Sequence, residues 1–236
     1  MAMLVRTARC GLIDCCSRRF GIGDGAMGRD PKDAIDVTAL CRGRHLVEVD
    51  DSVLVVIDIQ QVFLNKYDRA KAQSLIARVS WLIDLANHLR VPVVAMAENM
   101  AESGTLVEGI RAALPEGTPI YNKDFFGLCG NPEILRAIDD TNRKTAVCVG
   151  VETDVCVMQT ALGLLAEGFR VIALHDAVAT TEWDERIGIE RMRHAGVMIG
   201  SVKSLYYEWM RSVSACRRLD ASVPFLRSKR PPDLVM

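Results

Sequence analysis

Asp58 and Lys123 each end a short run of residues typical of a β-strand, and Cys156 follows a third such run, at the start of an apolar stretch with helical spacing. If these runs are parallel strands, their carboxyl ends meet at one edge of a sheet, which is where ligands bind in open α/β folds. An acid, a base and a thiol would then share one cleft.

These three residue types together are able to perform nucleophilic catalysis. A thiol is a weak nucleophile until it ionises, and a helix N-terminus and a nearby ammonium both lower the pKa of a thiol from about 8.5. Cys156 in the first turn of its helix, with Lys123 close by, meets both conditions, so we expect its pKa to be lowered. Asp58 would accept the thiol proton and return it to a leaving group.

Each residue taken alone has a simpler explanation. An aspartate at a strand end often forms a turn or caps a helix, a loop lysine is usually solvated, and a cysteine in an apolar helix is usually a core residue. Their arrival at the same sheet edge from three separate strands is what favours chemistry.

The elements that must position these residues alternate regularly along the chain. Short β-branched runs, typical of strands buried on both faces, are followed by longer stretches with an apolar stripe at helical spacing. We predict strands at 53–57, 91–97, 119–122, 145–149, 170–174 and 197–202. We predict helices at 72–89, 105–114, 132–139, 156–167, 183–194 and 204–213. This pattern predicts an α/β fold: a three-layer, Rossmann-like sheet of six parallel strands with helices on both faces.

The same pattern divides the chain into three parts. Residues 1–48 are predicted to be a loosely ordered N-terminal extension, 49–214 the α/β domain, and 215–236 a C-terminal tail that wraps the surface or frays. Met1 and Met27 both stay open as the native start. Residues 23–28 match G-x-G-x-x-G, but no buried strand precedes them and no helical period follows, so we interpret the match as chance.

Composition excludes several classes of protein. Of the 236 residues, 50% are hydrophobic and 25% charged, and the net charge is −1, which is typical of a globular protein without a nucleic-acid or membrane-surface footprint. No apolar run approaches the ~18–20 residues of a membrane helix. The eight cysteines form no C-x-x-C pair, which favours reduced thiols in a cytoplasmic protein over a zinc site. Organellar targeting by the arginine-containing N-terminus is the less favoured alternative.

Three stretches resemble the signatures of the isochorismatase-like cysteine hydrolases. They are residues 58–63 (DIQQVF), 123–126 (KDFF) and 150–157 (GVETDVCV), of which the last is highly specific. Residues 162–180 are also similar to that family, and the resemblance covers roughly 53–213.

The resemblance implies a sheet of order 3-2-1-4-5-6 and an Asp58–Lys123–Cys156 triad that hydrolyses amides or related C–N bonds through a thioester. It also implies a non-proline cis peptide between Val151 and Glu152, with the backbone N–H groups of Glu152 and Cys156 forming an oxyanion hole. Such proteins commonly form dimers or higher homo-oligomers.

Two aromatic residues are candidates for contact with a small-molecule substrate. Phe63 follows the aspartate at the spacing usual in the family, and Phe126 follows the lysine. Aromatic residues at such positions also commonly pack in the core.

Departures from the family pattern indicate which branch of the family this sequence resembles. Metal-binding nicotinamidases of this family carry an Asp-x-His pair and a further histidine, and His45, His88, His175 and His194 lack that spacing. We therefore expect no metal and no cofactor, and a closer similarity to the metal-free branch.

Two other functions stay open: a catalytically silent scaffold with this fold, and a thiol redox protein. His175, beside Asp176, is a less favoured alternative base for Cys156.

Overall fold

The computed structural model of the protein describes residues 46–236. The predicted N-terminal extension up to residue 45, with Met27 and the glycine motif, lies outside the described residues. Among those described, no helix is long and apolar enough to cross a membrane. Cys129, Cys148, Cys156 and Cys216 are free thiols.

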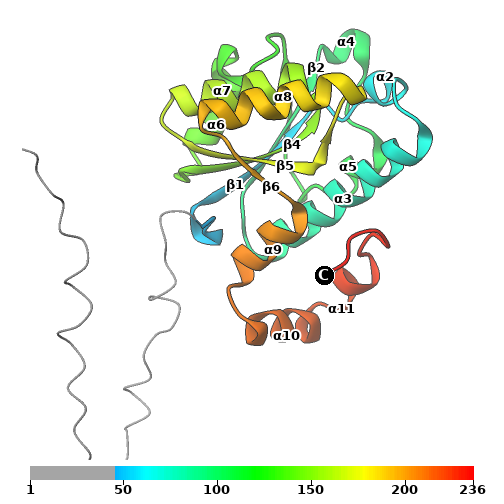
Figure 1. Ribbon diagram of the computed structural model, residues 1–236, viewed down its shortest axis with the longest axis vertical. Helices are drawn as coiled ribbons and strands as arrows, with labels where there is room; N and C mark the ends of the chain where they lie inside the picture. The colour runs from blue at the N-terminus through cyan, green and yellow to red at the C-terminus, as the bar shows by residue number, and fades with distance from the viewer. Residues whose placement is uncertain (1–45) are drawn as a thin grey trace, which may run out of the picture. The chain divides into compact units, whose positions relative to one another are not determined.

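One sheet of six parallel strands organises the fold (Figure 1), as predicted. The strands are β1 (Ser52–Ile57), β2 (Val93–Glu98), β3 (Ile120–Lys123), β4 (Thr145–Val151), β5 (Arg170–Ala179) and β6 (Met198–Gly200). Their order is β3-β2-β1-β4-β5-β6, so β1 and β4 lie at the centre and the order reverses between them. This reversal is the point at which open α/β sheets form their binding crevice.

Helices cover both faces of the sheet, with α6, α7 and α8 on one side and α3, α5 and α9 on the other (Figure 1). The helices of eight or more residues are α3 (Arg69–His88), α6 (Pro132–Asp139), α7 (Met158–Ala166), α8 (Glu182–Ala195), α9 (Val202–Met210) and α10 (Val213–Ser222). The shorter ones are α2 (Gln61–Leu64), α4 (Met100–Ser103), α5 (Glu108–Arg111) and α11 (Pro224–Ser228). Short turns of other helical types are η2 (Val49–Asp51), η3 (Leu128–Gly130) and η4 (Thr153–Val157).

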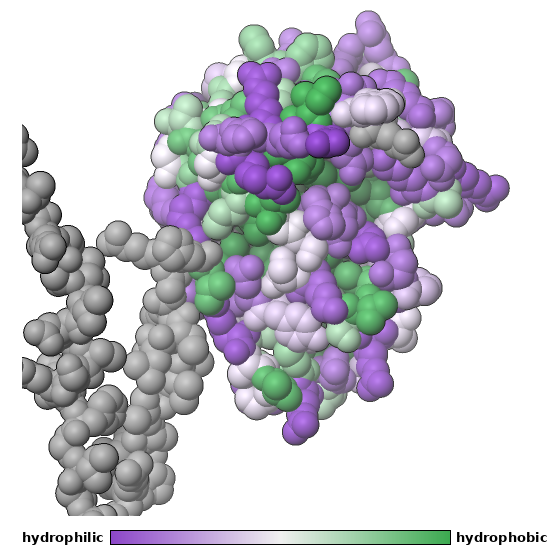
Figure 2. Space-filling model, in the orientation of Figure 1, coloured by the Kyte–Doolittle hydropathy of each residue, from purple (hydrophilic) through white to green (hydrophobic). Residues whose placement is uncertain are grey.

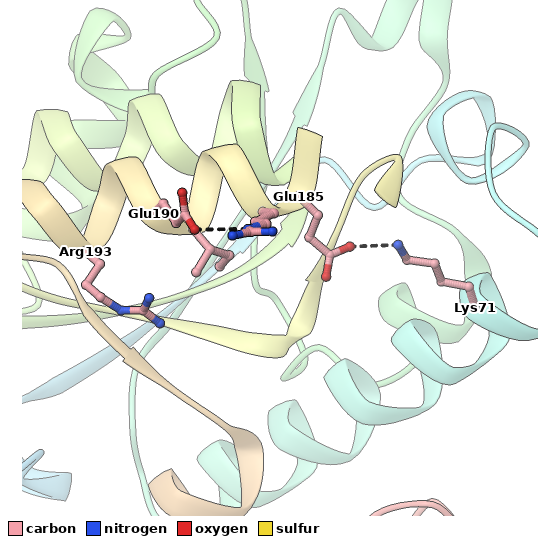
Figure 3. A pocket seen from close by; sticks show the side chains of 6 residues that line it. Lys71, Glu185, Glu190 and Arg193 are labelled. Atoms are coloured by element: carbon pink, nitrogen blue, oxygen red, sulfur yellow. Dashed lines mark hydrogen bonds and ion pairs between the residues drawn. The ribbon is translucent and has the colours of Figure 1, made fainter. Parts of the chain in front are cut away.

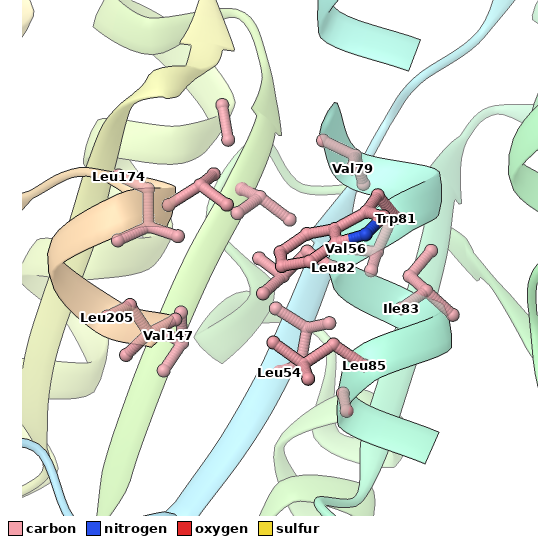
Figure 4. Close-up of a cluster of buried hydrophobic side chains, with 14 of the residues drawn as sticks. Leu54, Val56, Val79, Trp81, Leu82, Ile83, Leu85, Val147, Leu174 and Leu205 are labelled. Atoms are coloured by element: carbon pink, nitrogen blue, oxygen red, sulfur yellow. The ribbon is translucent and has the colours of Figure 1, made fainter. Parts of the chain in front are cut away.

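The residues of β1 alternate between two hydrophobic cores. Leu54 and Val56 face α3, while Val53, Val55 and Ile57 face α6 and α7. All six residues of the strand are buried, which explains why its sequence is a continuous apolar run rather than an alternating one. Figure 4 shows Leu54 and Val56 packed with Val147, Leu174 and the side chains of α3.

Several element boundaries differ from the predicted ones for local reasons. The predicted strand at 197–202 is shorter, because Ser201 caps the helix α9 by accepting a hydrogen bond from Ser204 N at 3.1 Å. The predicted helix at 105–114 is reduced to the single turn α5. Strand β5 runs on to Ala179, five residues past its predicted end, after an irregularity in its pairing with β4.

The segment predicted as a C-terminal tail contains most of α10 and all of α11. Leu219, Leu226 and Leu234 from this segment are buried against the α3 face. Trp81 of α3 donates from Nε1 to the carbonyl oxygen of Leu226 at 2.7 Å. Arg78 of the same helix bonds Asp233 Oδ2 at 2.8 Å. The segment therefore wraps the domain as ordered helices and completes one of its two cores.

Candidate active site

Asp58 follows the end of β1 with its backbone in the left-handed region (φ 51°). Aspartate tolerates this conformation better than most residues. Its N–H donates to Met96 O on the neighbouring strand at 3.1 Å, and its side chain is fully buried. The turn therefore directs a carboxylate into the interior at the switch point of the sheet.

Gly150 lets β4 approach β1 at the same level. It adopts φ 129°, and a Cβ there would lie 1.9 Å from Ile57 O, closer than any side chain allows. The next peptide bond but one, between Val151 and Glu152, is cis, as the resemblance implied. Glycine at this position is thus required for the carboxyl ends of β1 and β4 to lie close together.

Lys123 is the last residue of β3 and is fully buried. Its Nζ lies 2.9 Å from Asp58 Oδ2 and donates to Phe125 O at 3.1 Å and Phe126 O at 2.8 Å. Burial alone lowers the pKa of Lys123, but the facing charges, above all that of Asp58, raise it beyond its ordinary value. The side chain is therefore an ammonium held by three oxygen atoms.

Cys156 lies in η4, a wide helical turn that continues into α7. The prediction of a helix start is confirmed, although the helix begins at Thr153 rather than at the cysteine. Gly188 of α8 allows this turn to pack closely, since a Cβ there would lie 2.8 Å from Asp154 Cα. Cys156 is 4% exposed, and its thiol donates to Glu98 Oε2 at 3.2 Å.

The predicted lowering of the Cys156 pKa is wrong for this resting arrangement. Burial raises the pKa of the thiol and the charge of Asp58 raises it further, while Lys123 only partly opposes them. Burial also raises the pKa of Asp58 from 3.8 to about 6, against the stabilising charge of Lys123. At neutral pH the site therefore holds a protonated thiol beside an ionised carboxylate, and the thiol needs a base.

Asp58, Lys123, Cys156 and Glu98 form one buried cluster at the edge of the sheet. Glu98 is the member that the sequence analysis missed. It ends β2, and its Oε2 lies 3.2 Å from Cys156 Sγ and 3.6 Å from Lys123 Nζ. The criterion that selected Asp58, a carboxylate at the end of an apolar run, also fits Glu98 and was not applied to it.

Asp58, Glu98 and Cys156 each offer one ligand atom within 4.8 Å of the other two, a set chemically able to bind a divalent cation. The Lys123 ammonium, however, lies 2.9 Å from one carboxylate and 3.6 Å from the other. A metal ion held by the same oxygens would face this positive charge at short range, so the cluster fits an ammonium better.

The predicted substrate-contacting aromatics lie at different places. Phe126 is 51% exposed, in the loop whose carbonyls hold Lys123. Phe63, in α2, is partly buried against the α3-side core. Lys66 lies over the Phe63 ring, 5.1 Å from its centre, and pairs with Glu152 Oε1 at 3.0 Å. This ion pair connects the turn that follows α2 to the residue that precedes the cysteine turn.

His175 is not part of the cluster. It is exposed and lines a cavity of about 250 Å³ together with Arg78 and Asp176. Arg78 Nη1 bonds Asp176 Oδ2 at 2.8 Å, and Asp176 Oδ1 accepts from Val202 N at 2.8 Å, so this aspartate fixes the start of α9. The alternative in which His175 serves as the base of Cys156 does not fit this arrangement.

A further cavity of about 350 Å³ lies between α8 and Lys71 of α3 and is not lined by Cys156 (Figure 3). Four of its five charged side chains form ion pairs: Lys71 pairs with Glu185 at 2.7 Å, and Arg186 pairs with Glu190 at 3.1 Å. Hydrophilic and hydrophobic residues are interspersed on the face of the molecule seen in Figure 2. The reactive groups are thus concentrated at the sheet edge rather than in this cavity.

The six-stranded parallel sheet with helices on both faces is the α/β architecture of the isochorismatase class. Residues 52–204 match the isochorismatase domain, and the chain belongs to the isochorismatase family of hydrolases. Isochorismatase family protein 1B of Dictyostelium discoideum is 28% identical over 191 residues, which cover 79% of this chain and 90% of that protein. Protein 1A of the same organism is 30% identical over 162 residues, covering 66% of this chain and 77% of that protein.

A solved structure agrees with this assignment. The YcaC gene product of Escherichia coli, described as an octameric hydrolase of unknown specificity, superposes with a TM-score of 0.73 at 25% identity. The match covers 81% of this chain and 94% of that one. Family membership and the parallel fold are therefore established, whereas the reaction of this protein must be inferred from its site.

Proposed function

We propose that this protein is a cysteine-dependent hydrolase that cleaves an amide or related C–N bond of a small molecule through a thioester on Cys156. The observation that carries the proposal is the convergence of a thiol, a buried carboxylate and a buried ammonium at one edge of the sheet. The carboxylate of Asp58 reaches within 4.8 Å of the sulfur, and the ammonium of Lys123 lies 2.9 Å from Asp58 Oδ2.

Asp58 is the base in the proposed first step. Its Oδ1 is buried and accepts no hydrogen bond from residues 46–236, so it has a lone pair available for a proton. Cys156 Sγ attacks the substrate carbonyl carbon as its proton passes to Asp58, and Lys123 stabilises the negative charge that moves between these atoms.

The tetrahedral intermediate carries an oxyanion. We propose that two backbone N–H groups donate to this oxygen: that of Glu152, which directly precedes the η4 turn, and that of Cys156, within the turn. As the intermediate collapses, the C–N bond breaks and Asp58 returns its proton to the departing nitrogen. Asp58 then takes a proton from water, whose oxygen attacks the thioester carbon. The C–S bond breaks, Asp58 returns the proton to the sulfur, and the acid product leaves with Cys156 restored as the thiol.

No metal takes part in this cycle, because acid–base and nucleophilic groups are all supplied by side chains. Phe63 and Phe126 are proposed to border the substrate. We also propose a homo-oligomeric assembly, since the related YcaC protein is described as octameric.

The test is release of ammonia or amine from a panel of small amides, with Cys156→Ala and Asp58→Asn as matched variants. The proposal expects turnover by the wild type, loss of turnover in both variants, and an acyl adduct on Cys156 by intact mass measurement. Silence of the wild type across a broad panel, without any adduct, would favour the scaffold. Reversible oxidation of Cys156 that persists in Asp58→Asn, without hydrolysis, would favour the redox protein.

A further inference from the structure

Glu98 is the only carboxylate of the buried cluster with access to solvent among the described residues. Its side chain is 19% exposed, whereas those of Asp58 and Lys123 are 0% exposed. A molecule that approaches the cluster from solvent therefore meets Glu98 before it meets Asp58.

Glu98 has only a long ion-pair contact to Lys123 and no hydrogen bond from it. Lys123 Nζ directs its short contacts to Asp58 Oδ2, Phe125 O and Phe126 O, at 2.9, 3.1 and 2.8 Å. Its distance to Glu98 Oε2 is 3.6 Å, too long for a good hydrogen bond. The Cys156 thiol, at 3.2 Å, is the donor that Glu98 Oε2 has at rest.

This donor disappears when the sulfur attacks. Once the proton has moved to Asp58 and the sulfur is bonded to the carbonyl carbon, Glu98 Oε2 stands beside the new bond with a free lone pair. The nitrogen of the substrate is attached to that same carbon, and an N–H on it is the donor within reach. A carboxylate accepts hydrogen bonds and donates none, so it selects for N–H groups.

The backbone of Glu98 is fixed by a side chain dedicated to it. Gln60, fully buried, accepts from Glu98 N with its Oε1 at 2.8 Å and donates from Nε2 to Glu98 O at 2.8 Å. The same amide nitrogen bonds Gly104 O at 2.6 Å. The position of Glu98 is therefore built into the end of β2 rather than left to a loose loop.

Charge in the cluster is unbalanced. One ammonium, Lys123, faces two carboxylates, Asp58 and Glu98. The nearby cation Lys66 is already paired with Glu152. Transfer of the thiol proton to Asp58 moves charge within the cluster without changing its sum. An anionic group on the substrate close to the scissile carbonyl would be repelled by this excess.

We propose that Glu98 is a specificity-determining residue, which accepts a hydrogen bond from the nitrogen of the scissile group and selects uncharged or cationic amides over anionic ones. This inference rests on the proposed hydrolytic function and names its substrate class.

The charge selection is tested without a known substrate, by the rates at which two methanethiosulfonate reagents modify Cys156. One carries an aminoethyl cation and the other a sulfonatoethyl anion, and peptide mass analysis isolates Cys156 from the other thiols. The ratio of cation to anion rates is expected to fall on the order of tenfold in Glu98→Gln, because a unit charge a few ångströms away is removed. Glu98→Asp keeps the charge and should keep a high ratio. Glu102→Gln, an exposed carboxylate in α4, is the matched control and should leave the ratio unchanged.

An unchanged ratio in Glu98→Gln would overturn the selection by charge, as would failure of both reagents to reach Cys156 in the wild type. A neutral methyl methanethiosulfonate reagent checks that each folded variant keeps its cysteine accessible. Modification of Cys156 by these reagents does not require hydrolysis of a substrate. The experiment therefore distinguishes a failure of the charge selection by Glu98 from a failure of the proposed hydrolytic function.

The hydrogen bond is tested with an amide from the panel and the ester of the same acid, which lacks the N–H. Glu98→Ala should lower kcat/KM on the amide by about tenfold or more, the effect of losing a charge-assisted hydrogen bond. Hydrolysis of the ester should fall far less. An equal loss on both compounds would rule out contact with the nitrogen.

Discussion

The ammonium of Lys123 lies 2.9 Å from Asp58 Oδ2, and neither side chain is exposed to solvent. The two residues are 65 positions apart in the sequence and end non-adjacent strands of the sheet, with β2 between them. A buried pair of this kind is costly to break, because removal of either partner leaves a charge in a medium that solvates it poorly. The pair therefore ties the stability of the sheet edge to the chemistry of the site.

Replacing Lys123 by methionine should destabilise the protein by about 3–5 kcal/mol, since the Asp58 carboxylate loses its buried partner. The double variant Lys123→Met/Asp58→Asn should be less destabilised than the sum of the single changes. Urea unfolding provides the free energies.

The control for this prediction is Arg186→Met. Its pair with Glu190 is exposed, with 78% of the arginine side chain accessible, so the expected cost is below about 1 kcal/mol. Equal costs for the buried and the exposed pair would contradict the argument.

Acylation of Cys156 should depend on pH through Asp58. Because burial raises the pKa of Asp58 to about 6, the rate of acylation should rise with pH around that value as the carboxylate becomes able to accept the thiol proton. The nitrophenolate burst from p-nitrophenyl acetate measures this rate. Asp58→Asn should remove the rise near pH 6, whereas Asp154→Asn should retain it.

The raised pKa of Asp58 should make the free energy of unfolding fall with pH, whereas it makes the acylation rate rise. A carboxyl group whose pKa is higher in the folded state, about 6 against 3.8, binds its proton more tightly when folded. Its contribution is fully present below pH 3.8 and is lost as the pH rises through about 6. The free energy of unfolding of the wild type relative to Asp58→Asn should therefore fall across this window; a rise would show that the pKa is lowered instead.

Gly150→Ala should destabilise the protein by more than about 3 kcal/mol or prevent folding, because the new Cβ would lie 1.9 Å from Ile57 O. Gly104→Ala is the matched control. It also has a positive φ, 75°, but nothing lies within 4 Å of its Cβ position, so only the conformational cost of about 1–3 kcal/mol applies. Thermal unfolding distinguishes the two, and a similar loss for both would mean that the contact with β1 relaxes freely.

Asn131→Ala should lower stability and slow the acylation of Cys156, although Asn131 does not contact Asp58 or Cys156. The Asn131 side chain accepts from Asp124 N at 2.9 Å and donates to Gly127 O at 3.1 Å, which shapes the loop that presents the carbonyls of Phe125 and Phe126 to Lys123. We expect a loss of about 1–3 kcal/mol in stability and a slower acylation of Cys156.

The comparison variant for this change is Asn65→Ala. Asn65 is exposed and accepts a single side-chain hydrogen bond, from Gln61 at 2.7 Å, so its removal should change neither property measurably. If Asn131→Ala lowers stability but leaves the acylation rate intact, the loop does not position Lys123.

Local pattern was sufficient to predict most of the scaffold. The continuous apolar run of β1 predicts a strand buried on both faces, and the segment Pro132–Asp139 forms α6 with the predicted bounds because a proline starts it and an apolar stripe continues through it. The convergence of Asp58, Lys123 and Cys156 was also predictable, because parallel strands end at one edge of their sheet.

Three features depended on tertiary contacts that no local pattern records. Glu98 joins the cluster because β2 pairs with both β1 and β3, which brings its end beside Lys123. The tail is ordered because Trp81 and the α3 face supply a surface for Leu226. The pKa of Cys156 is raised rather than lowered because burial and Asp58 outweigh Lys123, a balance set by packing in three dimensions.

The sequence alone determined which residues are apolar, where strands and helices alternate, and which reactive side chains stand at strand ends, because these properties depend on spacing along the chain. Only the tertiary structure decided which charged side chains face one another and how far each is exposed to solvent. The strength and even the sign of an electrostatic effect depend on distance and burial, and both are fixed only when separate strands pack together.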